Sequence, residues 1–438
     1  MTARESTLFA ILLIFMLRGS LQNCPADPKR EYMTACIAEC LELSSNKKNC
    51  TLDFDTGTLL GEKCAMNKPF EQTPLLANQK IMICDINPNN NAYQKVEKVA
   101  DMNLCTHFMF GSWYFYNSLT KTFEPRTNII PDQLLAKEHA QEHGAKTILN
   151  FGSISQSTGI SPGNWSIAAA DAATRGKLIN QMVELMEENE FDALSIYWWY
   201  SGCPNQECTK GNKKDKENLV SLMKELYKAI KERGKLLFLI LPTSDGILIQ
   251  GYDMNALWNN VDYFYVNTYT YEGTWNDYLG YSTNLLNVKM SIGYIKDKLG
   301  AAKMRKVIAG FTSSVTLYAL VKMKTKPKYR DPVFPALSYY TSMLNLCEKV
   351  QRENYSVILE DINNNLAHNT THVYVFEDFN TLKEKVNYFK SNGLGGMIYS
   401  GVTSDDDENK CGCGVMPMLR IASELLHGGG CSLKQCLN

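Results

Sequence analysis

The sequence predicts an α/β protein whose main part is a (β/α)8 TIM barrel, and three observations support this fold. Eight short apolar runs follow one another between residues 80 and 401. Helix-like segments lie between them, and strand alternating with helix over such a length is typical of a parallel barrel. Most runs are almost continuously hydrophobic, as expected for parallel strands whose two faces are both covered.

Each run is interpreted as one barrel strand, and the stretches between them supply the helices. The seventh and eighth runs are far apart, which leaves room for a small α+β insertion at about 315–378. The eight runs are KIMICDI (80–86), THFMFGSW (106–113), KTILNFGS (146–153), ALSIYWW (193–199), LLFLILP (236–242), YFYVNTYT (263–270), KVIAGFTS (306–313) and GGMIYSG (395–401). Helices are expected over Pro131–His143, Asp171–Glu187, Lys213–Arg233, Leu285–Leu299 and Thr381–Ser391.

The amino-terminal residues 1–22 have the pattern of a cleaved signal peptide, with Arg4 before the apolar run Thr7–Leu17. An uncleaved anchor is the alternative, but this run is about half the roughly 20 residues needed to cross a bilayer. We therefore expect a secreted, extracellular protein without a membrane span after cleavage. A cysteine-rich segment at 23–74, the barrel at 75–427 and a cysteine-containing tail at 428–438 complete the predicted organisation.

Composition excludes several classes of partner and cofactor. The formal net charge is -1, so there is no electrostatic reason to expect nucleic acid. No cofactor and no metal are expected: the H-x-x-E-H pattern from His139 to His143 and the acidic run from Asp405 to Glu408 are both interpreted as solvated surface. Fourteen cysteines in an exported chain imply disulfides. Four sequons are candidate glycosylation sites, at Asn49, Asn164, Asn354 and Asn369.

Several segments, in order, resemble the family-18 glycoside hydrolases, the chitinases, over roughly Lys80 to Leu426. ICDINP followed by NLCTHFMF resembles the family's first two strands with their bridging cysteines, and KTILNFGS resembles its third strand. ALSYYTSMLNLC (336–347) resembles the start of its inserted domain, and VFEDFNTLKEKVNYFKSNGLGGMIYS (375–400) resembles its last helix and strand. The resemblance implies a chitinase-type barrel with a sugar site at its mouth.

The family's fourth-strand signature, Asp-Gly-x-Asp-x-Asp-x-Glu followed by Tyr-Pro, is degenerate in this chain. The segment from Asp192 to Ser201 keeps only the first Asp, Trp198 and Tyr200. By this resemblance, Ser195 and Tyr197 replace the two acids that orient the substrate, and Trp199 replaces the glutamic acid that protonates the glycosidic oxygen. Alternate strand residues share one face, so these three side chains would point into the barrel. Loss of a general acid alone costs on the order of 10²–10⁴ in rate.

Further sugar-site positions also differ from the family. The sixth-strand motif retains Tyr269 but has Thr270 in place of an aspartate, and Ser400 stands where the family has a stacking tryptophan. Tyr197 and Trp199 are interpreted as packing inside the barrel or as a rebuilt aromatic platform. Glu272 is the only nearby carboxylate identified as a substitute acid. The candidate ligand-binding residues are Trp113, Trp199, Tyr200, Tyr269, Glu272 and Trp275.

These features predict a non-catalytic chitinase-like protein that binds chitin or a related N-acetylglucosamine glycan at the barrel mouth. Two alternatives remain: an active glycosidase with a relocated acid such as Glu272, and a protein-interaction scaffold that binds no sugar. The protein partner of such a scaffold is unknown. A degenerate site argues against an enzyme, but fold-level analogy does not transfer function.

The resemblance also implies disulfides. Cys84 matches the family's first bridge with Cys105, and Cys347 is expected to join Cys411. Cys203 and Cys208 lie in one short loop and most simply pair with each other. Five of the remaining cysteines are amino-terminal and three are carboxy-terminal, so complete oxidation would tie the two ends together: Cys24, Cys36, Cys40, Cys50, Cys64, Cys413, Cys431 and Cys436.

Overall fold

The structure of the protein is a computed structural model. It describes residues 50–53, 58–61, 80–86, 92–101, 103–152, 159–353, 355–358, 365–411 and 415–427. The predicted signal peptide, the carboxy-terminal tail and the tie between the terminal cysteines lie outside the described residues. Within the cysteine-rich segment, β1 (Cys50–Asp53) and β2 (Thr58–Gly61) form an antiparallel pair.

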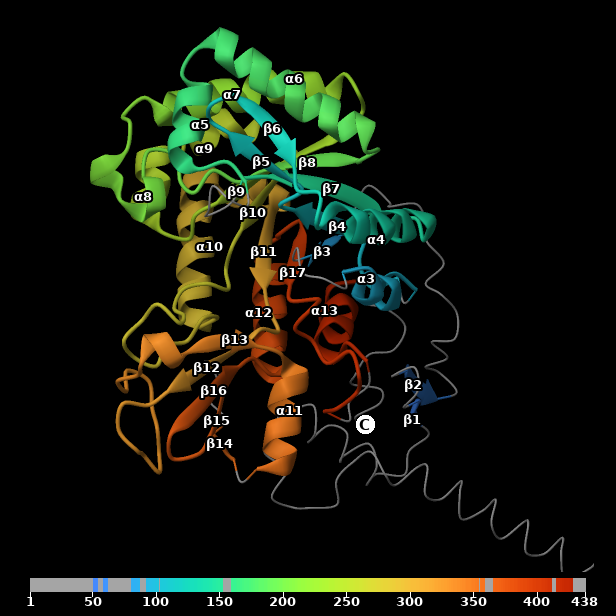
Figure 1. Ribbon diagram of the computed structural model, residues 1–438, viewed down its shortest axis with the longest axis vertical. Coiled ribbons are helices and arrows are strands. Elements are labelled where there is room, and N and C mark those ends of the chain that lie inside the picture. Colours follow the sequence, from blue (N-terminus) through green and yellow to red (C-terminus); the bar gives the residue numbers. More distant parts are fainter. Residues whose placement is uncertain are drawn as a thin grey trace, which may run out of the picture.

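Eight parallel strands close into a barrel, which confirms the predicted fold (Figure 1). Each of the eight predicted runs supplies one of these strands. The first strand, β3, pairs with the last, β17, and this pairing closes the ring. In chain order the strands are β3 (Ile81–Ile86), β4 (His107–Gly111), β7 (Lys146–Phe151), β8 (Ala193–Ile196), β9 (Leu236–Leu241), β10 (Tyr263–Val266), β11 (Val307–Phe311) and β17 (Gly396–Ser400).

Helices follow most of these strands and surround the barrel. The helix predicted at Leu285–Leu299 has those bounds in the structure. The helix predicted to begin at Thr381 begins earlier, at Phe379, because Asp378 caps it: the Asp378 carboxylate accepts a hydrogen bond from the Thr381 backbone, and the Thr381 hydroxyl accepts one from the Asp378 backbone. The helices are α3 (Ala92–Asp101), α4 (Ile130–Glu142), α5 (Pro162–Ala169), α6 (Ala172–Glu188), α7 (Asp215–Lys231), α8 (Asp245–Gly251), α9 (Met254–Trp258), α10 (Leu285–Leu299), α12 (Phe379–Ser391) and α13 (Pro417–His427).

Shorter elements complete the described fold. Strands β5 (Tyr114–Asn117) and β6 (Thr122–Pro125) form a hairpin after β4. Four short 3-10 helices lie at η3 (Pro204–Gln206), η4 (Cys208–Lys210), η5 (Ala301–Lys306) and η6 (Pro335–Leu337).

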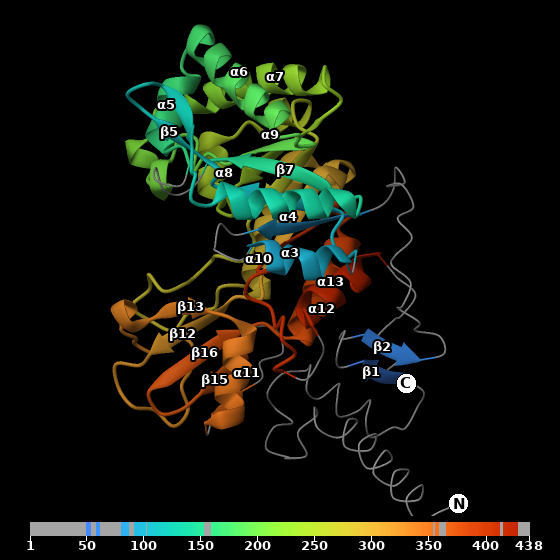
Figure 2. The same cartoon turned by 45° about the vertical axis from the view of Figure 1, so that its right-hand side comes forward.

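An insertion with its own sheet lies between β11 and α12, where the sequence predicts it (Figure 2). Its five strands are antiparallel in the order β13-β12-β16-β15-β14, and α11 (Met343–Arg352) belongs to the same unit. Two of these strands have only three residues each, and an alternating pattern of side chains cannot be recognised over so short a segment. The strands are β12 (Val315–Ala319), β13 (Tyr339–Thr341), β14 (Ser356–Ile358), β15 (Asn365–His368) and β16 (His372–Phe376).

Alternate residues of the barrel strands point inward and fill the interior with apolar side chains. On β3 the inward residues are Ile81 and Ile83, which pack with Met109, Ile148 and Ile398 from neighbouring and facing strands. The outward residues pack beneath the helices in a separate, larger core. An interior filled in this way leaves space for a ligand only at the carboxyl ends of the strands.

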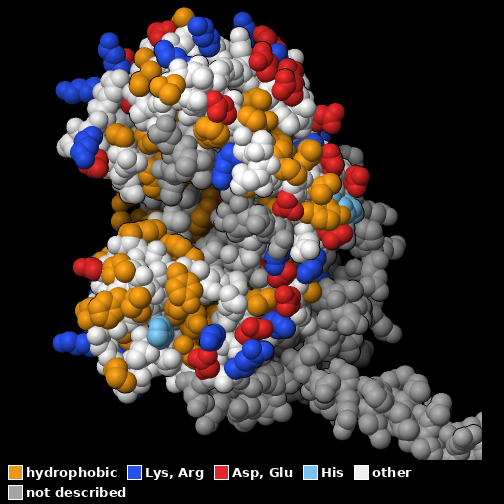
Figure 3. All heavy atoms as spheres, viewed as in Figure 1, with side chains coloured by type: hydrophobic (Ala, Val, Ile, Leu, Met, Phe, Trp, Pro, Cys, Tyr) orange, Lys and Arg blue, Asp and Glu red, His pale blue; other side chains and the backbone are white. Residues whose placement is uncertain are grey.

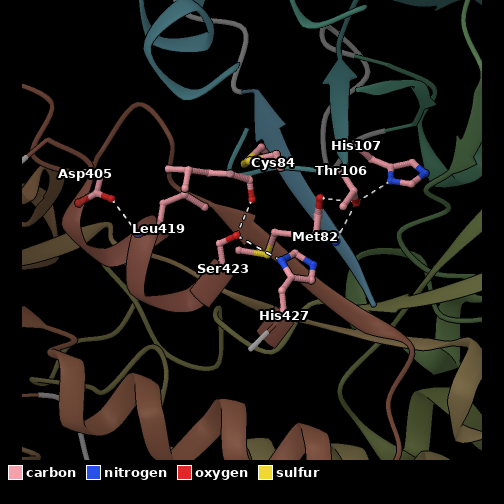
Figure 4. Close-up of a disulfide and its surroundings, with 10 residues drawn as sticks. Met82, Cys84, Thr106, His107, Asp405, Leu419, Ser423 and His427 are labelled. Atoms are coloured by element: carbon pink, nitrogen blue, oxygen red, sulfur yellow. Dashed lines mark hydrogen bonds between the residues drawn. A yellow bond between two sulfur atoms is a disulfide. The ribbon is translucent and has the colours of Figure 1, made fainter. Parts of the chain in front are cut away.

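The Cys84–Cys105 disulfide lies where the last helix meets the first strands (Figure 4). The Ser423 hydroxyl of α13 donates a hydrogen bond to the carbonyl of Leu104, at 2.9 Å. The His427 ring nitrogen Nε2 lies 3.0 Å from the carbonyl oxygen of Lys80. These bonds join the carboxy-terminal helix to the start of the barrel, so the two ends of the barrel sequence hold each other.

The three aspartates of the acidic run after β17 are buried, which corrects their interpretation as solvated surface, whereas Glu408 is exposed as expected. The Asp405 carboxylate accepts the backbone N–H of Leu419 in the first turn of α13, and Asp406 accepts those of Lys410 and Cys411. Asp407 forms an ion pair with Lys95 and Lys98 of α3. The run therefore organises the connection between β17 and α13.

No helix among the described residues is long and apolar enough to cross a bilayer.

Candidate functional site

A cavity of about 580 Å³ opens at the carboxyl ends of the barrel strands. All eight barrel strands contribute to its lining, either with residues near their carboxyl ends or with residues of the loops that follow them. This is the position that parallel barrels use for ligands. The described residues that line it are Asp85, Ile86, Met109, Gly111, Ser112, Asn150, Gly152, Tyr197, Trp199, Gln206, Ile240, Tyr265, Asn267, Tyr269, Thr270, Trp275, Ser314, Ser400, Gly401, Thr403 and Ser404.

The fourth barrel strand brings two aromatic side chains to this cavity. Strand β8 ends at Ile196, so Tyr197 and Trp199 stand in the segment just beyond it, with their rings edge to face and centroids 5.5 Å apart. Ser195 is fully buried one layer deeper and does not line the cavity. The side chains thus point inward as predicted, but only Tyr197 and Trp199 line the cavity.

None of these three positions carries a group that protonates a leaving oxygen at neutral pH. Burial raises the pKa of the Tyr197 phenol well above its usual value, although a hydrogen bond from Asn267 opposes the shift. A phenol held more firmly in its neutral form is a poor proton donor in water. The indole of Trp199 has one N–H and no acidic proton.

Further candidate residues line the other side of the cavity. The hydroxyl of Tyr269 lies 2.5 Å from that of Tyr265, and burial raises the pKa of both phenols. Thr270 is exposed at the rim, and Ser400 lies at the end of β17. The Ser400 hydroxyl donates to the Asp85 carboxylate at 3.4 Å. Tyr269, Thr270 and Ser400 thus share one cavity, as predicted from their strands.

Asp85 is a functional candidate that the sequence analysis missed. Its side chain lines the cavity at the end of β3, so the statement that Glu272 is the only nearby carboxylate is wrong. Burial raises the pKa of Asp85 to about 7, and the hydrogen bond from Ser400 only partly offsets the shift. The signal was present in the sequence: Ile81 and Ile83 alternate inward, and Asp85 is the next residue on that face.

Glu272 does not line the cavity, and its carboxylate is engaged in hydrogen bonds within the loop and the insertion. Its oxygens accept the hydroxyl of Tyr278 at 3.1 Å, the hydroxyl of Tyr329 at 2.8 Å and the backbone N–H of Tyr281 at 2.7 Å. The side chain is 12% exposed and also faces Arg330. These contacts indicate a structural role rather than that of a substitute acid.

The three predicted rim aromatics occupy different environments. Trp275 is 59% exposed at the edge of the cavity and is free to stack on a ligand. Trp113 is buried against Phe110 and Phe191, and its indole donates to Gln133. Its prediction as a rim platform is therefore wrong. Tyr200 is also buried, with its ring stacked on Trp199 at 4.5 Å, so it supports the cavity wall without lining it.

The insertion lies beside this mouth, although none of its described residues lines the cavity. Figure 3 shows a hollow between the barrel and the insertion, with hydrophobic side chains gathered over the insertion on this face. The Tyr340 side chain hydrogen-bonds Thr274, which precedes Trp275. The large hydrophobic residues exposed on the insertion are Val321, Met323, Tyr329, Phe334, Leu337, Tyr339 and Tyr340.

Comparison with known proteins agrees with this geometry. Residues 87–403 match the family described as "Glycosyl hydrolases family 18", which is well over half of the chain. The chain belongs to this family. The prediction of a family-18 protein is confirmed.

One curated relative and two solved structures are similar to the chain. It is 24% identical over 433 residues to "Probable chitinase 10" of Drosophila melanogaster, covering 91% of this chain but only 19% of that protein's length. The second catalytic domain of the Ostrinia furnacalis Group II chitinase superposes with a TM-score of 0.71 at 23% identity, covering 80% of this chain and 97% of that one. Human YKL-39, described as a pseudo-chitinase with retained chitooligosaccharide binding, superposes with a TM-score of 0.65 at 15% identity, covering 79% and 99%.

The family-18 barrel of this chain contains the three disulfides that the sequence predicted. Cys84 is bonded to Cys105, Cys203 to Cys208 and Cys347 to Cys411. The second bridge closes the short loop after β8, directly beside the cavity wall. The third joins α11 of the insertion to the segment after β17.

Two of the four predicted glycosylation sites lie within the described residues. Asn164 is partly exposed in the first turn of α5. Asn369 is also partly exposed, but its amide donates to the Tyr355 hydroxyl and its oxygen accepts the backbone N–H groups of Thr371 and His372. Attachment of a glycan at Asn369 would replace one of the two hydrogens on the nitrogen that makes the first of these bonds. Asn49 and Asn354 lie outside the described residues.

Proposed function

We propose that this family-18 protein is a secreted chitinase-like protein that binds a chitooligosaccharide-type glycan at the barrel mouth without hydrolysing it. The observation that carries the proposal is the fourth-strand end, where Trp199 and Tyr197 line the cavity and neither is a carboxylic acid. A glycosidase needs an acid at the scissile oxygen, and the phenol of Tyr197 is a poorer donor than in water.

Glycan binding is supported by the cavity itself and by its exposed rim. Aromatic faces are the usual platforms for sugar rings, and Trp275 and Trp199 offer two of them at the mouth. Retained chitooligosaccharide binding in the pseudo-chitinase YKL-39 gives this reading a precedent on the same fold. Export is supported by the predicted signal peptide and by the three disulfides, which form in oxidising compartments.

An active glycosidase is the second candidate, and one observation favours it. Asp85 lines the cavity, and its pKa of about 7 is near the value that suits a general acid at neutral pH. Asp85 stands at the end of β3 rather than β8, so it is not the acid that the resemblance to chitinases implies. Glu272 is a weaker substitute because its oxygens already accept three hydrogen bonds.

A chitin-bead pulldown beside a chromogenic chitooligosaccharide assay tests the proposal. We expect retention on the beads and no turnover by the wild-type protein. Trp199→Glu alone is not expected to create activity, because Ser195 and Tyr197 still replace the two orienting acids. Turnover abolished by Asp85→Asn or by Glu272→Gln would overturn the proposal in favour of an enzyme that uses that carboxylate. Absence of both retention and turnover would favour the scaffold alternative.

A further inference from the structure

The cavity at the barrel mouth carries one negative group and no positive one. Among the described residues that line it, Asp85 is the only charged side chain. Within the described part of the chain no lysine, arginine or histidine forms an ion pair with it. Its recorded hydrogen bond comes from the Ser400 hydroxyl at 3.4 Å, a long contact that leaves most of the carboxylate's capacity to accept unused.

Two residues that line the cavity also carry buried amide oxygens that accept no hydrogen bond from the described part of the chain. Asn150 uses its nitrogen to donate to the carbonyl of Gly152 at 3.3 Å, and Asn267 hydrogen-bonds the Tyr197 phenol. The Oδ1 oxygens of both are buried and have no partner among the described residues. A buried acceptor without a partner costs free energy, so a ligand that donates to these oxygens would recover it.

Aromatic rings line the same space. Tyr197, Tyr265 and Tyr269 stand on the wall with Trp199 above them, and the phenols remain neutral because burial raises their pKa. A carboxylate, free carbonyl oxygens and aromatic faces together complement a group that has several N–H donors, no acceptor and a positive charge. A primary ammonium has these properties, and aromatic faces attract it as well.

We propose that the cavity binds the protonated primary amine of a glucosamine unit at Asp85, so that the glycan it prefers is a partly deacetylated one. This rests on the proposed glycan-binding function, because the amine is that of a sugar in the same cavity. An N-acetyl group carries one N–H and one acceptor oxygen, so it satisfies the wall oxygens less well and leaves the Asp85 charge without a counterion.

The ionisation of Asp85 gives this preference a pH dependence. The groups that face it are the Ser400 hydroxyl and the neutral phenols of Tyr265 and Tyr269. Because burial raises the pKa of Asp85 to about 7, the empty site is largely neutral in acid and becomes an anion above that value. Binding of the 1,5-diaminopentane probe described below, whose alkyl amines stay protonated well above pH 7, is therefore expected to strengthen as the pH rises through 7.

Calorimetric titration of the whole secreted protein with three probes tests the inference. The probes are the glucosamine tetramer, the N-acetylglucosamine tetramer and 1,5-diaminopentane, which supplies the amine without a sugar. The variants are Asp85→Asn, which removes the charge and keeps the shape, and Asp277→Asn, which removes an exposed charge two residues after Trp275. Melting curves establish that both variants fold.

We expect Asp85→Asn to weaken binding of the glucosamine tetramer by at least about tenfold, the effect of one lost charge-assisted hydrogen bond. Asp277→Asn is expected to leave it unchanged, and binding of the acetylated tetramer is expected to change by less than about twofold in both variants. A glucosamine tetramer that does not bind, or that binds equally well to Asp85→Asn, overturns the inference. If the acetylated tetramer binds in that case, the proposed function stays in place. Binding of the diamine through Asp85, with neither tetramer bound, overturns both the inference and the glycan function, and it leaves only an amine site that takes no sugar. No binding of any probe overturns both.

Discussion

Replacing Asp85 with asparagine is expected to stabilise the folded protein near neutral pH and to leave its stability in acid almost unchanged. Asp85 has a pKa of about 7 in the folded chain, against 3.8 for an unperturbed aspartate. The unfolded chain therefore gives up this proton from about pH 4 upward, whereas the folded chain keeps it until about pH 7. Between these values the wild-type protein loses stability as the pH rises, and asparagine, which does not titrate, removes that loss.

The magnitude follows from the size of the shift. Each unit of pKa corresponds to about 1.4 kcal/mol, so a shift from 3.8 to about 7 gives an upper limit of about 4 kcal/mol. Asp85 partly faces a water-accessible cavity, which reduces the penalty, and we expect about 2–4 kcal/mol of stabilisation at about pH 8. In a chain of this size that corresponds to a rise of several degrees in melting temperature.

Thermal unfolding of wild-type and Asp85→Asn protein at a series of pH values between about 4 and 8 measures the effect. The exposed Asp277→Asn variant serves as the control, and its difference from wild type is expected to be small and independent of pH. A stabilisation by Asp85→Asn that is equally large in acid, or a variant that melts lower than wild type at neutral pH, would refute the reasoning.

Three further predictions concern single side chains. Trp275→Ala is expected to weaken retention on chitin by about 0.5–1.5 kcal/mol without changing the melting temperature, because this ring is 59% exposed. Glu272→Gln is expected to lower the free energy of unfolding by about 1–3 kcal/mol in urea titrations, since a charged acceptor of two tyrosine hydroxyls and a backbone N–H is lost; unchanged stability would show that these bonds contribute little. Lys385→Met is expected to cost about 3–5 kcal/mol, because it leaves the buried Glu377 carboxylate, 2.6 Å from the Lys385 ammonium, without its ion-pair partner; the matched double variant with Glu377→Gln is expected to recover part of the loss.

The barrel was predictable because each of its strands is a dense apolar run. A run such as LLFLILP is buried on both faces whatever its exact register, so the strand β9 (Leu236–Leu241) could be identified without knowledge of its neighbours. The helix Leu285–Leu299 was predicted with its observed bounds; in the structure the Asn284 side chain caps its first turn, and Gly300 follows its last residue. The strands of the insertion were not predicted one by one, because three-residue elements depend on tertiary pairing.

The alternation of residues along the strands predicted which side chains point into the cavity. It did not predict how exposed each side chain is. Tyr197, Trp199, Tyr269 and Ser400 meet in one cavity because they stand at or just beyond the ends of three strands of the same barrel. Nothing in the sequence distinguishes the buried Trp113 from the exposed Trp275, since Trp113 is covered by side chains from distant parts of the chain, such as Phe191.

The buried acids show the same limit of sequence reasoning. The carboxylates of Asp405 and Asp406 satisfy backbone N–H groups in the connection to α13, a role that depends on where that connection runs. A run of acids is most often solvated, and only the folded chain reveals the donors that these two serve. Asp85, in contrast, could have been found by extending the alternation of Ile81 and Ile83 by one step.

The Cys347–Cys411 bridge has a consequence for the entropy of binding. The insertion is joined to the barrel through β11 and α12, and the bridge adds a third attachment at α11, across a separation of 64 residues. The backbone N–H of Met343, at the start of α11, donates to Ser404 on the cavity rim at 2.8 Å. An insertion held at three points keeps Ser404, and with it this side of the cavity rim, nearly fixed before a ligand arrives. The ordering cost of recognition then falls on the ligand, and stiff oligosaccharides that already match the cleft are favoured over flexible ones.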